Sequence, residues 1–388
     1  MKRIERLKAR LMASADAAHR NPRFGLPEWA NEEVVATIRN RPIICCGSGF
    51  WAQEFLRNAH PLDVIAVVDD SHAGRQVLGL PCIDTAGLLE LAAKRPDAIC
   101  INTGHSDAGY SHFERLGLER SLQTLDHMQA VRAFGFTPDL RVSDWREPIV
   151  ARIEEFLAIA GRLADPLSVE TLYAVLLYHL EIDREHLLAI NRPGECAYFR
   201  SGLFTLRERE SYVDCGAFDG DSVQQFIRVA KGRFQHIEAF EPDPQNFARL
   251  TAWLASEPRY AARTTLHQQA VGSTTGSIQL TSTGDAGACI PLHADGQGNC
   301  TVPLVTLDDA LSGPISLLKL DVEGHELEIL RGARQHLIHE APRLALCAYH
   351  LPGDLIDLPA FIEGLDAGYR IGIRHHSATR YDTVLYAF

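Results

Sequence analysis

The chain has 388 residues, of which 46% are hydrophobic and 23% charged, and its formal net charge is −12. This length predicts two or three domains, and the composition is that of an ordinary soluble protein. The negative charge argues against nucleic acid or an anionic membrane as the main partner. No apolar run is long enough to span a bilayer. The basic N-terminal stretch, interrupted by Asp16, lacks the apolar core of a signal peptide. We therefore expect a cytoplasmic protein.

Residues 1–140 are expected to form N-terminal helices followed by a Rossmann-like module. Pro42 to Cys46 is predicted as a strand, a G-x-G-x-x-A turn runs from Gly47 to Ala52, a second strand at 64–68 ends in Asp69, and a further strand is expected from Ala98 to Asn102. This acid follows the turn at about the 20-residue spacing of a dinucleotide ribose site. The same glycines also serve plain helix–strand packing, so a structural or partner-binding module is favoured over a nucleotide site.

Two further features predict structure and not chemistry. Residues 141–204 are expected to be a helical connector, because apolar residues recur at helical spacing in segments 148–163 and 167–190. The nine cysteines are scattered and form no C-x-x-C pair. Five of them fall in predicted buried strands, where we interpret them as small buried side chains in a reducing compartment: Cys45, Cys46, Cys100, Cys215 and Cys347. The scattered spacing gives no zinc site.

From residue 205 to the C-terminus, predicted strands alternate with helices. The strands are Tyr212–Cys215, Ile237–Phe240, Thr264–Ala270, Ile315–Leu320, Arg343–Tyr349, Arg370–Arg374 and Thr383–Ala387. Alternation predicts a largely parallel sheet with helices on both faces. The last two strands are joined too closely for a crossover helix, so they should pair antiparallel. A hairpin is expected from Ser277–Ser282 and Thr301–Val305. The predicted fold class is α/β, with two Rossmann-like doubly wound domains joined by the helical connector.

The stretch from Ser211 to Asp221, SYVDCGAFDGD, is predicted as a strand, a glycine turn and a helix start, with Asp221 or Ser222 as the helix cap. Glycines let the backbone approach a ligand, and a helix start offers free N–H groups. A phosphate-binding loop would avoid the acids in this turn, so it suits a cationic or zwitterionic ligand. The second strand ends in Glu241, which could accept hydrogen bonds from both ribose hydroxyls. The acidic glycine turn followed by Glu241 is more typical of a binding site for S-adenosylmethionine (SAM) than of one for NAD.

Four ordered blocks extend this pattern over residues 205–388. They are Val213–Ala217 with Gly220 and Asp221, Phe240–Asp243, Gln268–Gly272 with Val305–Asp309, and Leu318–Glu326 with Leu330–Gly332. Together they resemble the FkbM family of SAM-dependent methyltransferases. The resemblance implies a class I methyltransferase fold and O-methylation of a sugar or polyketide-like small molecule. The expected cofactor-binding residues are Asp214, Gly216, Ala217, Gly220, Asp221, Ser222, Glu241, Pro242, Gln268 and Ala270.

The candidate catalytic residues follow the later strands. Asp321 and Glu323 come just after the fourth strand, beside the expected cofactor cleft, and His350 follows the fifth. Asp321 could be the general base or hold a divalent metal that lowers the pKa of the acceptor hydroxyl, and Glu323 could orient either. The competing interpretation of Glu323 is a charge at a helix N-terminus. His350 is a candidate substrate contact or proton acceptor, as are His375 and His376. The sequence assigns no residue set to a metal.

Three functions stay open at this point. A SAM-dependent methyltransferase acting on a small-molecule or sugar hydroxyl accounts for the C-terminal blocks. An NAD-linked oxidoreductase would use the N-terminal module, and a non-catalytic SAM-binding scaffold would keep the cofactor site without turnover. The sequence leaves a homo-oligomer open as well.

Overall fold

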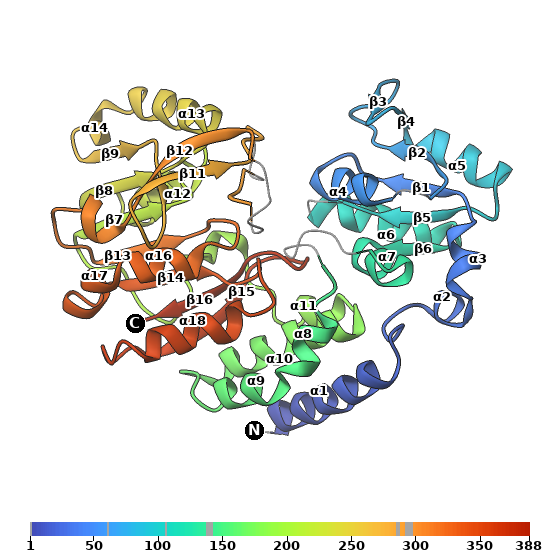
Figure 1. Ribbon diagram of the computed structural model, residues 1–388, viewed down its shortest axis with the longest axis horizontal. Coiled ribbons are helices and arrows are strands. Elements are labelled where there is room, and N and C mark those ends of the chain that lie inside the picture. Colours follow the sequence, from blue (N-terminus) through green and yellow to red (C-terminus); the bar gives the residue numbers. More distant parts are fainter. Residues whose placement is uncertain (1, 60–61, 105–106, 137–142, 285–287, 292–297) are drawn as a thin grey trace. The chain divides into compact units, whose positions relative to one another are not determined.

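The chain forms two compact units (Figure 1). The computed structural model describes residues 2–59, 62–104, 107–136, 143–284, 288–291 and 298–388. Unit 1 comprises Met1–Leu7, Arg152–Val175 and Leu187–Phe388, and unit 2 comprises Lys8–Ala151 and Leu176–His186. The residues expected to form a connector are thus divided between the two units.

Unit 2 contains a six-stranded sheet in the order β3-β4-β2-β1-β5-β6. Its strands are β1 (Ile43–Cys46), β2 (Val64–Val68), β3 (Gln76–Val77), β4 (Leu80–Ile83), β5 (Ile99–Asn102) and β6 (Thr124–Asp126). The three strands that the sequence predicts here are confirmed as β1, β2 and β5, and the short strands β3, β4 and β6 were missed. All pairs are parallel except the β3–β4 hairpin. Its turn holds Leu78 and Gly79 at φ of 47° and 82°, as a two-residue hairpin requires.

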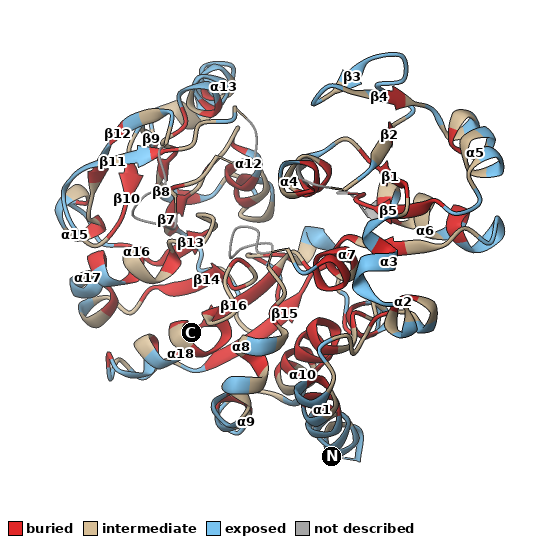
Figure 2. Ribbon diagram, turned by 45° about the vertical axis from the view of Figure 1, so that its right-hand side comes forward, coloured by how far each residue is buried: buried red, intermediate tan, exposed pale blue. Residues whose placement is uncertain are grey.

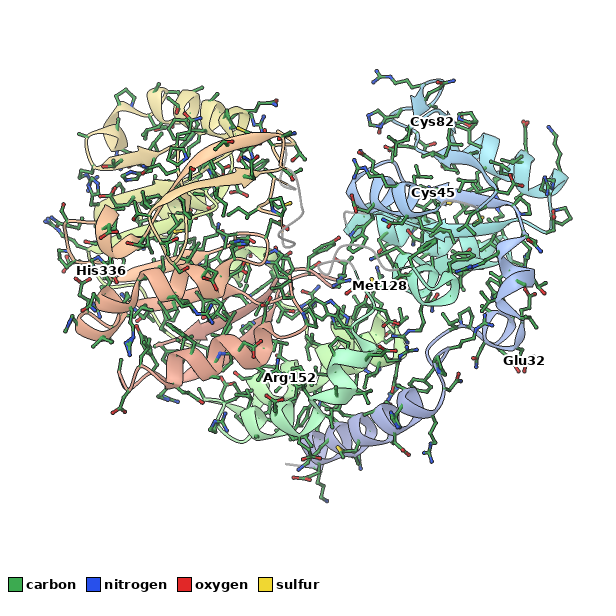
Figure 3. The ribbon with its side chains drawn as sticks, viewed as in Figure 1. Glu32, Cys45, Cys82, Met128, Arg152 and His336 are labelled. Atoms are coloured by element: carbon green, nitrogen blue, oxygen red, sulfur yellow. The ribbon has the colours of Figure 1, made fainter. Side chains whose placement is uncertain are left out.

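The strands of this sheet supply much of the buried core of the unit, and eight helices lie in the same part of the chain within the described residues. The helices are α1 (Lys2–Arg20), α2 (Glu28–Glu32), α3 (Val35–Arg39), α4 (Phe50–Asn58), α5 (Thr85–Lys94), α6 (Asp107–Glu119), α7 (His127–Phe134) and α8 (Arg146–Ala151). Cys45 and Cys82 lie on β1 and β4 as buried free thiols (Figure 3), in agreement with the expected packing role. Within the described ranges, no helix is long and apolar enough to cross a membrane.

Unit 1 is built on a seven-stranded sheet in the order β15-β16-β14-β13-β7-β8-β9. Its strands are β7 (Glu210–Cys215), β8 (Phe234–Phe240), β9 (Thr264–His267), β13 (Leu317–Leu320), β14 (Arg343–Cys347), β15 (Ile371–His375) and β16 (Thr383–Ala387). The pairs are parallel except that β16 runs antiparallel to both neighbours, which confirms the predicted final pair. The central strands are buried along nearly all of their length (Figure 2).

A three-stranded sheet accompanies the main one. It contains β10 (Ala270–Val271), β11 (Gly276–Leu280) and β12 (Cys300–Val305) in the order β10-β12-β11. The antiparallel β11–β12 pair confirms the predicted hairpin. The single strand expected at 264–270 is wrong, because β9 ends at His267 and β10 belongs to the smaller sheet.

The remaining helices pack on the sheet of unit 1 or precede it. They are α9 (Ile153–Ala160), α10 (Pro166–Glu181), α11 (Glu185–Leu188), α12 (Asp221–Val229), α13 (Pro244–Ala255), α14 (Pro258–Ala261), α15 (Leu307–Ala310), α16 (Glu326–Gly332), α17 (Arg334–His339) and α18 (Asp354–Glu363). Asp243 caps α13 by accepting two backbone N–H groups. The predicted cap of α12 is wrong, because Gly220 occupies the cap position at φ 94° and neither Asp221 nor Ser222 caps the helix.

Candidate active site

A cavity opens in unit 1 at the carboxyl ends of β7, β8 and β13, where ligands bind in doubly wound sheets. The predicted site residues that line it are Gly216, Asp221, Ser222, Glu241, Pro242, Ala270, Asp321 and Glu323. The predicted residues outside the lining are Asp214, Ala217, Gly220, Gln268 and His350. Gln268 is exposed, and its neighbour Gln269 faces the cavity instead.

The glycine turn after β7 is packed directly against the segment after β13. Gly216 has φ 78°, and a Cβ atom at this position would lie 1.8 Å from the carbonyl oxygen of Asp321. Only glycine fits such an approach of two backbones. The turn that the sequence assigns to the cofactor and the segment that it assigns to catalysis are therefore in contact.

Asp214 is buried beside this turn and does not line the cavity. Its side chain is 0% exposed, and its Oδ2 accepts hydrogen bonds from the hydroxyls of Tyr212 (2.8 Å) and Ser222 (2.6 Å). Lys319 Nζ lies 3.0 Å from its Oδ1 and donates to the carbonyl of Gly216 at 2.7 Å. Burial lowers the pKa of Lys319, but the negative charges of Asp214, Asp321 and Asp221 together outweigh burial and hold it above the ordinary value. Asp214 thus holds Ser222 and Lys319 in place, and both of these side chains line the cavity.

Glu241 ends β8 with a carboxylate that is 4% exposed. Its Oε2 accepts the backbone N–H of Phe218 at 2.8 Å, and its Oε1 accepts that of Asp243 at 2.9 Å. Burial nevertheless raises its pKa to about 7. Each carboxylate oxygen can accept a second hydrogen bond, so ribose hydroxyls could still be bound.

Asp321 is held at the cavity wall by two tyrosines. Its Oδ1 accepts from the hydroxyl of Tyr349 and its Oδ2 from that of Tyr198, each at 3.2 Å. Burial raises the pKa of Asp321, but the charges of Lys319 and His350 outweigh burial and hold it below the ordinary value. Asp321 is therefore ionised at neutral pH, and it is a weak base.

His350 is 3% exposed and lies behind the cavity wall. Its Nδ1 is 2.9 Å from Glu326 Oε1, and its Nε2 is 3.6 Å from Asp321 Oδ1 and 3.7 Å from Glu323 Oε1. Burial lowers its pKa, but these carboxylates, Glu326 first, outweigh burial and raise it to about 10. An imidazole that is already protonated cannot accept a proton, so the structure argues against the proton-acceptor role expected for His350.

The other predicted histidines are wrong as cavity residues. His375 Nδ1 is hydrogen-bonded to the Thr383 hydroxyl at 2.9 Å, and His376 Nε2 to the Tyr386 hydroxyl at 3.0 Å. Both are buried outside the lining, and burial lowers their pKa values to about 3 and about 4. Conversely, the sequence missed Tyr198, which precedes β7 and reaches the cavity from outside the motif blocks.

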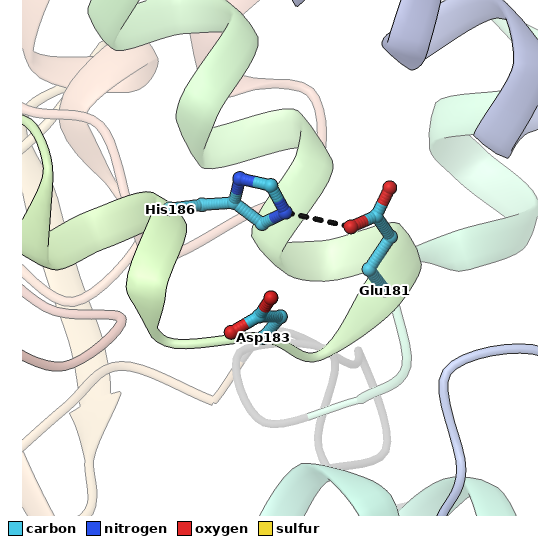
Figure 4. A group of neighbouring side chains, drawn as sticks. All are labelled: Glu181, Asp183 and His186. Atoms are coloured by element: carbon cyan, nitrogen blue, oxygen red, sulfur yellow. Dashed lines mark hydrogen bonds and ion pairs between the residues drawn. The ribbon is translucent and has the colours of Figure 1, made fainter.

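The described residues contain two groups with metal-ligand geometry. One is formed by Asp321, Glu326 and His350 in unit 1, and the other is in unit 2. There, Glu181, Asp183 and His186 lie together at the end of α10 (Figure 4). The Glu181 carboxylate already accepts from the Ser14 hydroxyl (2.6 Å), Arg10 Nε (3.0 Å) and His186 Nε2 (2.7 Å). Because protein donors, one of them cationic, occupy this carboxylate, the group is an internal ion-pair network.

The dinucleotide-like turn of unit 2 has a structural explanation as well. A Cβ atom on Gly47 would lie 2.8 Å from Thr103 Oγ1, so this glycine permits close packing after β1. The Ser48 hydroxyl and the Ser71 backbone N–H both donate to the carboxylate of Asp69. These contacts favour the packing interpretation of the turn over a nucleotide site.

Comparison with known proteins identifies the family. The methyltransferase FkbM domain profile matches residues 214–371. A solved structure, methyltransferase FkbM from Methylobacillus flagellatus KT, is 35% identical with a TM-score of 0.83, and the match covers 98% of this chain and 99% of that chain. This chain belongs to the FkbM methyltransferase family. Hexuronic acid methyltransferase AglP of Haloferax volcanii is 30% identical over 194 residues, which are 47% of this chain and 75% of AglP.

FkbM membership confirms the class I methyltransferase fold predicted for the C-terminal half, and it makes the chain a methyltransferase. The similarity to the Methylobacillus FkbM protein extends beyond the sequence blocks, because it spans nearly the whole chain. The N-terminal module, which the sequence resemblance left unexplained, is part of that similarity.

Proposed function

We propose that this FkbM methyltransferase uses SAM to methylate a hydroxyl group of a sugar or polyketide-like small molecule. The observation that carries the proposal is the arrangement of Gly216, Glu241 and Asp321 around one cavity at the strand ends. Because AglP is named as a hexuronic acid methyltransferase, sugar acids are the first acceptors to test.

The lining residues fit SAM. Gly216 lets the turn pack closely beside the cavity, Glu241 can accept hydrogen bonds from ribose hydroxyls, and the carboxylate of Asp221 in the lining suits a positively charged ligand. When bound, SAM supplies a methyl group made electrophilic by its sulfonium. Three predicted residues would fix the conformation of the turn without contacting SAM: Asp214, Ala217 and Gly220.

The chain's own residues then have to orient the acceptor and manage its proton. Transfer of the methyl group to the hydroxyl oxygen would leave the C–S electron pair on sulfur, and the hydroxyl proton would pass to solvent water. In this scheme Asp321 stabilises positive charge near the reacting oxygen, and Glu323 orients the acceptor. His350 acts through these carboxylates and positions them, since it does not line the cavity.

Calorimetry with SAM tests the cofactor assignment. Glu241→Ala should lose two hydrogen bonds to the ribose, worth about 1.5–3 kcal/mol, which is about 10- to 150-fold in affinity. Glu238→Ala is the matched control, because Glu238 lies on the same strand outside the cavity lining. Equal affinities in the two variants would contradict the ribose assignment.

Turnover tests the reaction. We expect release of S-adenosylhomocysteine with at least one member of a panel of hexuronic acids, neutral sugars and polyketide alcohols. Mass spectrometry of ligands retained by the purified protein separates the alternatives. Recovery of NAD in place of SAM would favour the oxidoreductase, and SAM binding without turnover on the panel would favour the scaffold.

A further inference from the structure

The pair formed by His350 and Glu326 has the arrangement of a metal-binding histidine and its supporting carboxylate. Both side chains are buried, at 3% and 1% exposed, and Nδ1 of the imidazole is 2.9 Å from Glu326 Oε1. The Val322 backbone N–H also donates to this oxygen at 3.1 Å, which fixes the carboxylate. Histidine ligands commonly donate one ring N–H to a carboxylate, so that the other nitrogen faces the ion.

The other ring nitrogen is directed at two more carboxylates. His350 Nε2 makes no hydrogen bond to any residue that the structure describes, yet it lies 3.6 Å from Asp321 Oδ1 and 3.7 Å from Glu323 Oε1. Both separations exceed a hydrogen bond. Ligands bound about 2.0–2.2 Å from a tetrahedral ion are about 3.3–3.6 Å apart. We propose that Asp321, Glu323 and His350 bind a divalent metal ion of the Mn²⁺ or Zn²⁺ type, with Glu326 orienting the imidazole.

The surroundings of the carboxylates support a cation between them. Both oxygens of Asp321 accept tyrosine hydroxyls, as metal-bound carboxylates usually do. Glu323 has φ 54°, a left-handed conformation that costs a non-glycine residue about 1–3 kcal/mol and that clusters at ligand sites. The nearby cation Lys319 is bonded to Asp214. A mixed imidazole and carboxylate ligand set suits Mn²⁺ or Zn²⁺ better than Mg²⁺ or Ca²⁺.

An ion here would border the cavity, because Asp321 and Glu323 line it. An acceptor hydroxyl could complete its coordination, and such binding lowers the pKa of the hydroxyl. This use of the ion rests on the proposed function, whereas the binding of the ion does not. The competing explanation is that a protonated His350 alone neutralises the three carboxylates.

Titration of the whole protein with Mn²⁺ or with Zn²⁺, without SAM, tests the site. We expect one bound ion per chain, seen by calorimetry and, for Mn²⁺, by loss of the free-ion EPR signal. His350→Ala should abolish binding, and Glu323→Gln should weaken it at least 10-fold. Glu326→Gln, which changes only the orienting carboxylate, should weaken it about 10- to 100-fold.

His186→Gln is the matched control, since it disrupts the second group with metal-ligand geometry, and it should bind as the wild type does. If His350→Ala does not fold, Glu323→Gln decides, because this side chain is 29% exposed at the cavity. The proposal is overturned if the wild type binds neither ion, if Glu323→Gln binds the ion as tightly as the wild type does, or if binding is lost in His186→Gln. SAM calorimetry on the same samples keeps the two proposals apart: metal binding without SAM binding contradicts only the proposed function, and the reverse contradicts only the metal site.

Discussion

Glu241 should make the stability of the protein depend on pH in a way that one substitution removes. Its folded pKa is about 7, whereas an unfolded glutamate titrates near 4.3. Below about pH 4 the group is protonated in both states and has no effect. As the pH rises from about 4.3 to about 7, the unfolded state loses the proton first, so the folded state loses stability. Above about pH 7 the loss is complete, and the shift corresponds to about 3.5 kcal/mol.

Glu241→Gln removes this titration. The amide offers one acceptor to the two backbone N–H groups of Phe218 and Asp243, so the variant also loses a hydrogen bond worth about 1–3 kcal/mol. That penalty does not change with pH, because the amide does not titrate. The difference in free energy of unfolding, variant minus wild type, should therefore rise by about 3.5 kcal/mol between pH 4 and pH 8.

Urea unfolding at closely spaced pH values measures this difference, and comparison of the two proteins cancels the titration of other groups. Glu208→Gln, an exposed residue of the same unit, gives the background. A flat difference between pH 4 and pH 8 would refute the reasoning and show that Glu241 is not desolvated. A rising difference would show that the fold keeps an unfavourable buried acid where a ribose is expected.

Three further predictions concern the turn and the segment after β13. Gly216→Ala should lower the free energy of unfolding by about 1–3 kcal/mol more than Gly202→Ala does. Both glycines have positive φ, but only Gly216 is packed against another backbone segment. Equal effects of the two substitutions in urea unfolding would contradict this contact. Lys319→Met should destabilise unit 1 by about 3–5 kcal/mol, because it leaves Asp214 as a buried unpaired charge. Adding Asp214→Asn to this variant should restore part of the lost stability. An unchanged midpoint of unfolding in Lys319→Met would disprove the ion pair. Asp321→Asn should reduce methylation about 10²- to 10³-fold by removing the charge that stabilises the reacting centre, with little change in SAM affinity by calorimetry. Near-normal turnover would remove Asp321 from the reaction.

Local sequence signals predicted the elements that carry the site. Glu241 directly follows β8 and Asp321 directly follows β13, and both strands could be predicted because a short run rich in apolar residues marks each of them. The two-residue β3 and three-residue β6 give no such run, so they were missed. Gln268 was assigned from the resemblance of the block at 268–272 to the FkbM family, and the structure turns the neighbouring Gln269 to the cavity instead.

The contacts that define the site could not be predicted in this way. His350 and Glu326 are 24 residues apart in the chain, and nothing in either motif indicates that they meet. Tyr198 reaches Asp321 across 123 residues. Asp214 was assigned to the cofactor from its place in the motif, yet strand β7 directs it toward Lys319 and the core. Such pairings follow from tertiary packing and not from local pattern.

The same packing joins cofactor binding to the proposed chemistry. Lys319 bonds to both Asp214 and the carbonyl of Gly216, and Gly216 in turn is packed against the carbonyl of Asp321. A shift of the turn must therefore move Asp321, and with it the carboxylate that lies 3.6 Å from His350 Nε2. Since a buried network of this kind has few alternative arrangements, its members should act as one unit. Substitutions at Lys319, which itself lines the cavity, should accordingly weaken SAM binding and metal binding together.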